Sequence, residues 1–276
     1  MASSGIRDGH WHSYSLGTRS TLAHRLRLPH RGGVSMTPTS ERHILITGAS
    51  SGIGRATALA FAAEGYPVAL VGRSPDKLAA LAELIQAQGG HAVVYALDLA
   101  KIDQVRTQVT AIAAAFAPVD VLINCAGMGY TASLLDTPLR DWQQVIDLNL
   151  TSVFQCIQGV LPSMRGRHQG TIINVISIAG KQTFPEWGAY CVSKFGLMAL
   201  SKTLAMEERS HGIRIVALCP GAVNTPLWDA EAVNADFDRT AMLSPEVVAQ
   251  SILYTALLPS QAVVEELTLM PHTGTF

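Results

Sequence analysis

Tyr190 and Lys194 lie four positions apart in the segment GAYCVSK, residues 188–194. On a helix this spacing places both side chains on one face, one turn apart. A free phenol has a pKa of about 10 and exchanges protons poorly at neutral pH. A nearby ammonium favours the phenolate and lowers that pKa towards neutrality. The spacing therefore favours a proton-transfer pair, and an aromatic core residue beside a lysine that reaches solvent is the open alternative.

A glycine-rich segment, TGASSGIGRATALAFA over residues 47–62, follows a short apolar run. Gly48, Gly52 and Gly54 are spaced G-x-x-x-G-x-G within it. Glycines between a strand and a helix allow a tight turn, so that main-chain N–H groups approach a pyrophosphate at the helix N-terminus. The segment indicates a dinucleotide-binding loop, and a capped Gly/Ser turn is the alternative.

The second apolar run ends in VALVGRS, with Gly72 followed by Arg73. A unit that binds NAD usually carries Asp or Glu at this point, where the carboxylate bonds the ribose 2′-OH. A guanidinium instead matches a phosphate in charge and geometry. The sequence therefore predicts NADP(H) as cofactor, with Arg73 at the 2′-phosphate, while a surface arginine in a loop stays open.

Seven short apolar runs alternate with longer helical patterns. The predicted strands are 43–47, 67–72, 91–97, 119–124, 171–176, 213–218 and 263–269, and helical patterns cover 75–88, 101–116, 139–165, 188–210 and 244–257. Strict alternation predicts an α/β, doubly wound Rossmann-type fold, with a seven-stranded parallel sheet and helices on both faces. Such a sheet binds ligands at the carboxyl ends of its strands.

The chain has two regions of different composition. Residues 1–40 carry a net charge of +4 with five arginines and seven serines, and the rest carries −5. We expect residues 1–40 to be a disordered N-terminal extension, or sequence upstream of a start at Met36, and a targeting peptide is also open. Residues 41–276 are long enough for a single catalytic domain.

The composition argues against several other classes of protein. A net charge of −1 gives no electrostatic footprint for nucleic acid. No apolar run approaches the roughly 18 residues of a membrane span. The four cysteines lack CxxC spacing and suit reduced thiols in the cytoplasm, and the histidines lack the spacing of metal ligands. We therefore expect a cytoplasmic protein without a metal site.

Seven motifs follow one another in a particular order. They are TGASSGIG (47–54), LDL (97–99), NCAG (124–127), LNLTS (148–152), ISIAG (176–180), YCVSK (190–194) and CPGAVNTP (219–226). In order and spacing they resemble the short-chain dehydrogenase/reductase family, in its single-domain branch, over residues 42–270. The sequence departs from the family pattern at Cys125, where a second asparagine is usual, and at Ile176, where a serine is common.

The resemblance implies a catalytic set of Asn149, Ser177, Tyr190 and Lys194. Ser177 would hold the substrate oxygen and Tyr190 would donate a proton to it. Lys194 would lower the pKa of Tyr190 and bind the nicotinamide ribose, and Asn149 would anchor a water molecule. The resemblance also implies contacts with the cofactor. They are Gly48, Ser50, Ser51, Ile53, Gly54, Arg73, Asp98, Leu99, Asn124, Ala126, Gly127, Tyr190, Lys194, Pro220, Gly221, Val223 and Thr225. Asp98 and Leu99 would contact the adenine, and Asn124 would also support the sheet.

The resulting hypothesis is an oxidoreductase that moves a hydride between NADP(H) and a carbonyl or secondary alcohol on a hydrophobic small molecule. The predicted substrate contacts are Ser177, Met128, Trp187 and Tyr190, with Gly129, Tyr130, Ile178, Phe184 and the stretch 226–241 around them. The resemblance also implies a homodimer or homotetramer formed through 139–165 and 188–210. An NAD-dependent alcohol dehydrogenase and a non-catalytic NADP(H)-binding sensor are the alternatives.

Overall fold

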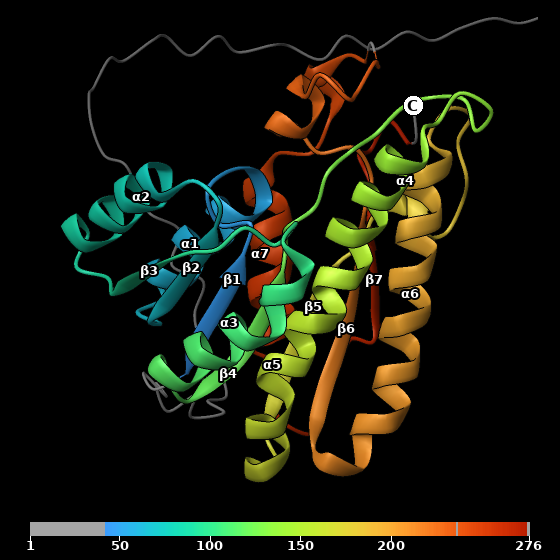
Figure 1. Cartoon of the computed structure of the whole chain (residues 1–276). Helices are drawn as coiled ribbons and strands as arrows, with labels where there is room; N and C mark the ends of the chain where they lie inside the picture. The colour runs from blue at the N-terminus through green and yellow to red at the C-terminus, as the bar shows by residue number, and fades with distance from the viewer. Residues whose placement is uncertain (1–41, 236, 275–276) are drawn as a thin grey trace, which may run out of the picture. The chain divides into compact units, whose positions relative to one another are not determined.

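The computed structural model describes residues 42–235 and 237–274 (Figure 1). The prediction made for residues 1–40 lies outside the described residues. Within them, no helix has both the length and the apolar character needed to cross a lipid bilayer.

The strands form one parallel sheet in the order β3-β2-β1-β4-β5-β6-β7, as the sequence predicts. Their bounds are β1 His43–Thr47, β2 Val68–Gly72, β3 Ala92–Ala96, β4 Val119–Asn124, β5 Gly170–Val175, β6 Ile213–Pro220 and β7 Glu266–Leu269. The central strands are buried along their length because helices cover both faces of the sheet. β7 begins three residues later than the apolar run from 263 predicts, because its ladder with β6 spans only Ala217–Pro220.

The helices divide between the two faces (Figure 1). Their bounds are α1 Gly52–Ala63, α2 Pro75–Ala87, α3 Ile102–Ala115, α4 Leu139–Ile146, α5 Ser152–Arg167, α6 Gly188–Glu208 and α7 Pro245–Ala256. Buried side chains of α1, α2 and α7 form one core with Ile44 and Ile46 of β1, and those of α3, α5 and α6 form the other with Leu45. The alternation along β1 shows why both faces need helical cover.

The helix predicted over 139–165 is interrupted. A π-helical segment, η1, occupies Asp147–Thr151 between α4 and α5, and Asn149 lies at its centre. A π-helical turn spaces its hydrogen bonds one residue wider than an α-helix and is frequent at functional sites. The apolar periodicity on either side of this turn fits a continuous helix, so periodicity alone gave no sign of the break.

A buried chain of polar side chains ties α6 to the middle of the sheet. The Asn124 amide donates to Asn174 Oδ1 at 2.9 Å, and the Asn174 amide donates to Ser201 Oγ at 2.8 Å. These residues belong to β4, β5 and α6 respectively and are almost inaccessible to solvent. Because a buried amide without a hydrogen-bond partner lowers the stability of the folded protein, this chain of hydrogen bonds favours one position of α6 on the sheet.

We expect Asn174→Ala to lower the free energy of unfolding by roughly 2–4 kcal/mol, because Asn124 and Ser201 both lose a buried partner. Urea denaturation measures the change. Ser201→Ala removes one partner only and serves as the control, with a smaller expected loss of about 1 kcal/mol. An Asn174→Ala protein as stable as the wild type would show that the hydrogen bonds from Asn124 through Asn174 to Ser201 do not hold α6.

Candidate functional site

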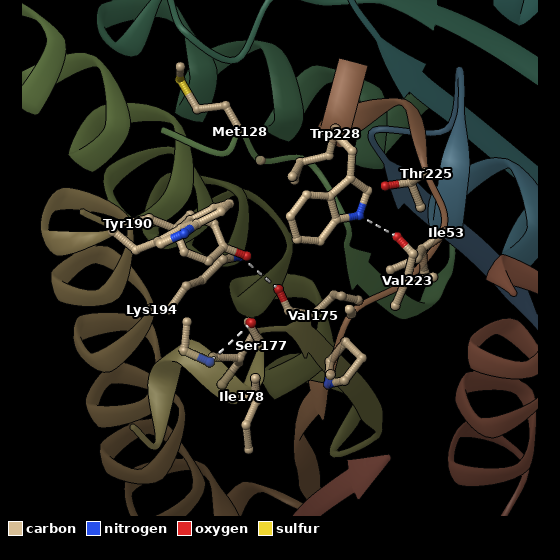
Figure 2. Close-up of a pocket in the computed structure, with 18 of the residues that line it drawn as sticks. Ile53, Met128, Val175, Ser177, Ile178, Tyr190, Lys194, Val223, Thr225 and Trp228 are labelled. Atoms are coloured by element: carbon tan, nitrogen blue, oxygen red, sulfur yellow. Dashed lines mark hydrogen bonds between the residues drawn. The ribbon is translucent and has the colours of Figure 1, made fainter. Parts of the chain in front are cut away.

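One cleft lies at the carboxyl edge of the sheet, where the segments after β1, β4, β5 and β6 meet (Figure 2). It encloses about 1000 Å³, part of it open to solvent. Ser177, Tyr190 and Lys194 line this cleft together with Ile53 and Thr225. The cleft therefore joins the predicted proton-transfer residues to Ile53 of the glycine loop.

The glycine loop is folded too tightly for side chains at two of its glycines. Gly48 has a φ of +67°, and a Cβ atom on Gly54 would lie 2.3 Å from the carbonyl oxygen of Gly48. A Cβ on Gly52 would lie 3.1 Å from Thr225 Cγ2. Ser51 precedes α1 without capping it through its side chain. A narrow loop that ends at a helix N-terminus fits the pyrophosphate of a dinucleotide.

The end of β2 leaves space beside the loop. A Cβ on Gly72 would stand 3.7 Å from Ser50 Oγ, an ordinary contact distance. Arg73 is exposed, and no ion pair joins it to another residue in the described part of the chain. Asp98 follows the neighbouring strand β3 and is partly exposed, and its carboxylate accepts a bond from the N–H of Ala100 at 3.1 Å. These groups suit the adenosine end of a phosphorylated dinucleotide.

Two predicted cofactor contacts have buried side chains. Leu99 is 4% exposed and packs in the core with α3, so only its main chain is left for a ligand. Asn124 is 1% exposed and its amide is bonded to Asn174, so it braces the sheet. At both positions a contact with the cofactor would therefore have to come from the main chain, and the part of the prediction in which Asn124 supports the sheet agrees with its bond to Asn174. A sequence motif names a position but does not say whether the side chain or the main chain acts there.

Tyr190 and Lys194 share one face of α6, as their spacing predicts. Lys194 Nζ lies 5.6 Å from the centroid of the Tyr190 ring and donates a hydrogen bond of 3.1 Å to the carbonyl of Val175 (Figure 2). Ser177 follows Val175 by two residues, and its Oγ accepts a bond from the N–H of Ala179 at 3.1 Å. The end of β5 therefore anchors both the ammonium and the hydroxyl.

The electrostatics of the pair differ from the sequence expectation, in which Lys194 lowers the pKa of Tyr190. Burial raises the pKa of Tyr190 to about 12, against a smaller lowering by the Ser177 hydroxyl. Burial also lowers the pKa of Lys194 to about 8. Desolvation disfavours the charged form of each group and is the largest cause of both shifts. Tyr190 is therefore a neutral phenol at physiological pH.

Asn149 is fully buried beside the cleft. Its Oδ1 accepts from the N–H of Met128 at 2.8 Å, and its amide donates to the carbonyl of Met128 at 2.9 Å and to Ser193 Oγ at 3.1 Å. A Cβ on Gly127 would lie 3.1 Å from Asn149 Oδ1 and 3.7 Å from Lys194 Nζ. The side chain is thus occupied in holding the segment after β4, which leaves little of it to anchor a water molecule.

The wall of the cleft away from the glycine loop is apolar and aromatic. Met128, Ile178, Phe184 and Trp187 line it as predicted, and the stretch 226–241 contributes Leu227, Trp228 and Phe237. Gly129 is buried, and the Tyr130 hydroxyl donates to Asp141 at 3.3 Å, so neither residue lines the cleft as predicted.

The role of the Val175 carbonyl could not be predicted from the sequence, because every residue has a main-chain carbonyl. Trp228, two residues after Pro226 of the last motif, could have been singled out.

Potential metal ligands do not gather anywhere in the described part of the chain: it holds no group of three or more His, Cys, Asp or Glu side chains suited to an ion. The four cysteines are free thiols.

A doubly wound sheet with a glycine loop after its first strand and a Tyr-x-x-x-Lys face at its carboxyl edge defines a dinucleotide-binding class of Rossmann-type proteins. Within this class the chain belongs to the short-chain dehydrogenase family, whose family model matches residues 42–235. The resemblance found in the sequence is confirmed.

Two relatives of the chain are named reductases, and a solved structure similar to it is an alcohol dehydrogenase. It is 37% identical over 235 residues to the 3-oxoacyl-[acyl-carrier-protein] reductase of Synechocystis sp., covering 83% of this chain and 94% of the relative. It is 33% identical to glycine betaine reductase ATRR of Emericella nidulans over 95% of this chain, which spans only 21% of that longer protein. A solved alcohol dehydrogenase from Thermococcus sibiricus, complexed with 5-hydroxy-NADP, superposes with a TM-score of 0.76 at 30% identity, covering 84% of this chain and 97% of the other.

Burial of Lys194 predicts a specific pH dependence of stability. The pKa of this lysine is 10.5 without the shift and about 8 in the folded protein, so between these values the unfolded state binds more protons and folding becomes more favourable as pH rises. We expect the stability of Lys194→Met, relative to the wild type, to fall by about 2 kcal/mol from about pH 7 to about pH 10. Urea denaturation of both proteins at the two pH values measures it. A difference independent of pH would contradict the lowered pKa.

Proposed function

We propose that the protein is an NADP(H)-dependent oxidoreductase that interconverts a carbonyl group and a secondary alcohol on a hydrophobic small molecule. The observation that carries the proposal is the gathering of Ser177, Tyr190 and Lys194 in one cleft with Ile53 and Thr225. Two hydroxyls and a buried ammonium there face the same space in which a dinucleotide held by the glycine loop would end.

The residues around the cleft fit the cofactor from end to end. The loop from Gly48 to Gly54 would hold the pyrophosphate, Arg73 the 2′-phosphate and Lys194 the nicotinamide ribose. Val223 and Thr225 would border the nicotinamide, which supplies the hydride when bound. The 5-hydroxy-NADP complex of the Thermococcus sibiricus relative supports the choice of a phosphorylated dinucleotide.

The chain's own contribution to reduction is to hold and deliver a proton. Negative charge develops on a carbonyl oxygen as it is reduced, and preorganised donors stabilise it most. The Ser177 hydroxyl would donate to this oxygen, and Tyr190 would transfer its proton to it. A phenol with a raised pKa keeps its proton until that oxygen becomes more basic than tyrosinate. Lys194, one helical turn away, would then stabilise the tyrosinate until it is reprotonated.

Apolar side chains on the outer surface of α5 and α6 support the proposed homo-oligomer. Phe154 of α5 and Val192, Phe195 and Met206 of α6 are 41–69% exposed. A second copy of the chain packed on these helices would remove them from water.

A panel of ketones, aldehydes and secondary alcohols, assayed for consumption or formation of NADPH and NADH, tests the proposal. We expect turnover of at least one hydrophobic carbonyl compound with NADPH. Tight binding of NADPH without turnover of any member would instead favour the non-catalytic sensor, and turnover with NADH alone would favour the NAD-dependent alcohol dehydrogenase.

We expect Tyr190→Phe to lower kcat by about 10²-fold or more and to change the affinity for NADPH only a few-fold. The substitution removes the phenol proton, while Lys194 stays in place for the ribose. Steady-state kinetics and fluorescence titration with NADPH measure the two effects. Tyr254→Phe, on the exposed surface of α7, is the matched control and should keep full activity. Near-normal turnover by Tyr190→Phe would rule out the phenol as proton donor.

We also expect a preference for NADPH over NADH in the lower half of a range of roughly 10–150-fold in kcat/KM, the value of one charge-assisted contact from Arg73. Arg73→Ala should remove most of it, chiefly through KM for NADPH. Gly72→Asp should invert it, because a carboxylate repels the phosphate and accepts a bond from the ribose hydroxyl, and the space beside Gly72 admits a side chain.

Arg140→Ala, at an exposed arginine on α4, is the control for the loss of a surface cation and should leave the ratio unchanged. A wild-type protein that uses NADH as well as NADPH would overturn the role given to Arg73.

A further inference from the structure

Aromatic rings form a continuous series along the cleft. Trp187 lies 5.4 Å from Tyr190 and 5.7 Å from Trp228, and Trp228 lies 5.4 Å from Phe237, all between ring centroids. The interplanar angles of 69°, 69° and 86° are edge-to-face arrangements. We call Trp187, Trp228 and Phe237 the aromatic wall. All three line the cleft that also holds Ser177 and Tyr190.

Hydrogen bonds hold Trp228 of the aromatic wall in place. The Trp228 indole donates to the carbonyl of Val223 at 2.8 Å (Figure 2). Arg239 donates to the side chains of Asn224 and Asp229 at 2.8 and 2.6 Å and to the carbonyl of Thr225 at 3.0 Å. These bonds fix the segment that carries Trp228 on both sides of the ring. A ring held in this way costs little entropy to present to a ligand.

The cleft offers little to a charged substrate. Among its described lining residues Lys194 is the one lysine or arginine, and Asp and Glu are absent. The Lys194 ammonium donates to the Val175 carbonyl, and no second lysine or arginine among the described lining residues could help it bind an acid group. A cationic ligand would find no carboxylate and would be repelled by the ammonium. A ligand with a neutral aromatic group therefore fits the aromatic wall best.

We infer that the substrate carries a neutral aromatic ring near its carbonyl group, and that this ring packs against Trp187, Trp228 and Phe237. The inference rests on the proposed function and narrows its substrate class. Edge-to-face contacts between aromatic rings favour an aromatic ring over a saturated one beyond the area that they bury. The wall would thereby select among ketones that Ser177 and Tyr190 treat alike.

Two ketones that differ only in the ring test this inference. Benzylacetone and its analogue with a cyclohexyl ring have the same spacer, so their carbonyl groups are equally reactive. We expect kcat/KM with NADPH to be about two- to tenfold higher for the phenyl compound, although the cyclohexyl ring is the more hydrophobic. Benzylacetones with a carboxylate or a trimethylammonium group on the ring should be at least about tenfold poorer than the parent.

Variants test whether the preference for the phenyl over the cyclohexyl ketone comes from the aromatic wall. Trp228→Leu should bring the phenyl-to-cyclohexyl ratio close to one, and Trp228→Phe should retain most of it because a ring remains. Tyr254→Phe changes an aromatic residue on the exposed surface of α7, outside the cleft, and should keep the ratio of the wild type. Comparing ratios within each variant cancels any general loss of activity.

Each outcome decides between the claims. Reduction of both ketones with equal kcat/KM, or a charged ring accepted as well as the neutral one, would overturn the inference and leave the proposed function standing. A preference that survives Trp228→Leu would also overturn it. Failure to reduce any of these ketones, while another carbonyl compound of the panel is reduced, would overturn the inference alone. Failure with every member of the panel would overturn the proposed function and the inference with it.

Discussion

The ammonium group of Lys194 sits in the interior at the end of β5, held by the carbonyl of Val175 and covered by the ring of Tyr190. A charge removed from water is costly unless polar groups surround it, and no carboxylate in the described part of the chain forms an ion pair with this one. Much of the surrounding structure serves to keep it there. The polar chain from Asn124 through Asn174 to Ser201 fixes α6, and Asn149 holds the segment after β4, whose Gly127 lies close to the ammonium.

Burial has opposite consequences for the two members of the pair. It brings the lysine pKa down to about 8 and takes the tyrosine pKa up to about 12, so the resting pair is a neutral phenol beside a weakly held ammonium. Burial of the ammonium costs stability, and it places the proposed proton donor in an apolar cleft, where electrostatic interactions are stronger than in bulk water. The aromatic wall keeps that cleft apolar, and the glycine loop opens it towards a dinucleotide.

Most of the fold follows from patterns that the sequence displays openly. Each strand of the parallel sheet is a short apolar run, and the motifs with chemistry lie directly after strands, so topology alone brings Ser177, Thr225 and the glycine loop together. The features that sequence reasoning missed depend on three-dimensional packing. The apolar periodicity continues through the π-helical turn at Asn149, so it does not indicate the break. The Val175 carbonyl is a main-chain group, so no residue type indicates its role. The raised pKa of Tyr190 depends on how much of the phenol is buried. Trp228 was within a predicted stretch, but only contacts with Trp187 and Phe237 show its place.

We propose that burial keeps Tyr190 protonated until the substrate oxygen takes up its proton. The most direct test is the ionisation of this one phenol, followed as the tyrosinate absorbance of the wild type minus that of Tyr190→Phe during an alkaline titration of the folded protein. We expect no tyrosinate from Tyr190 up to about pH 10, where an ordinary tyrosine is half ionised. A complete tyrosinate step below about pH 9 would contradict it and would show that Lys194, rather than burial, governs the phenol.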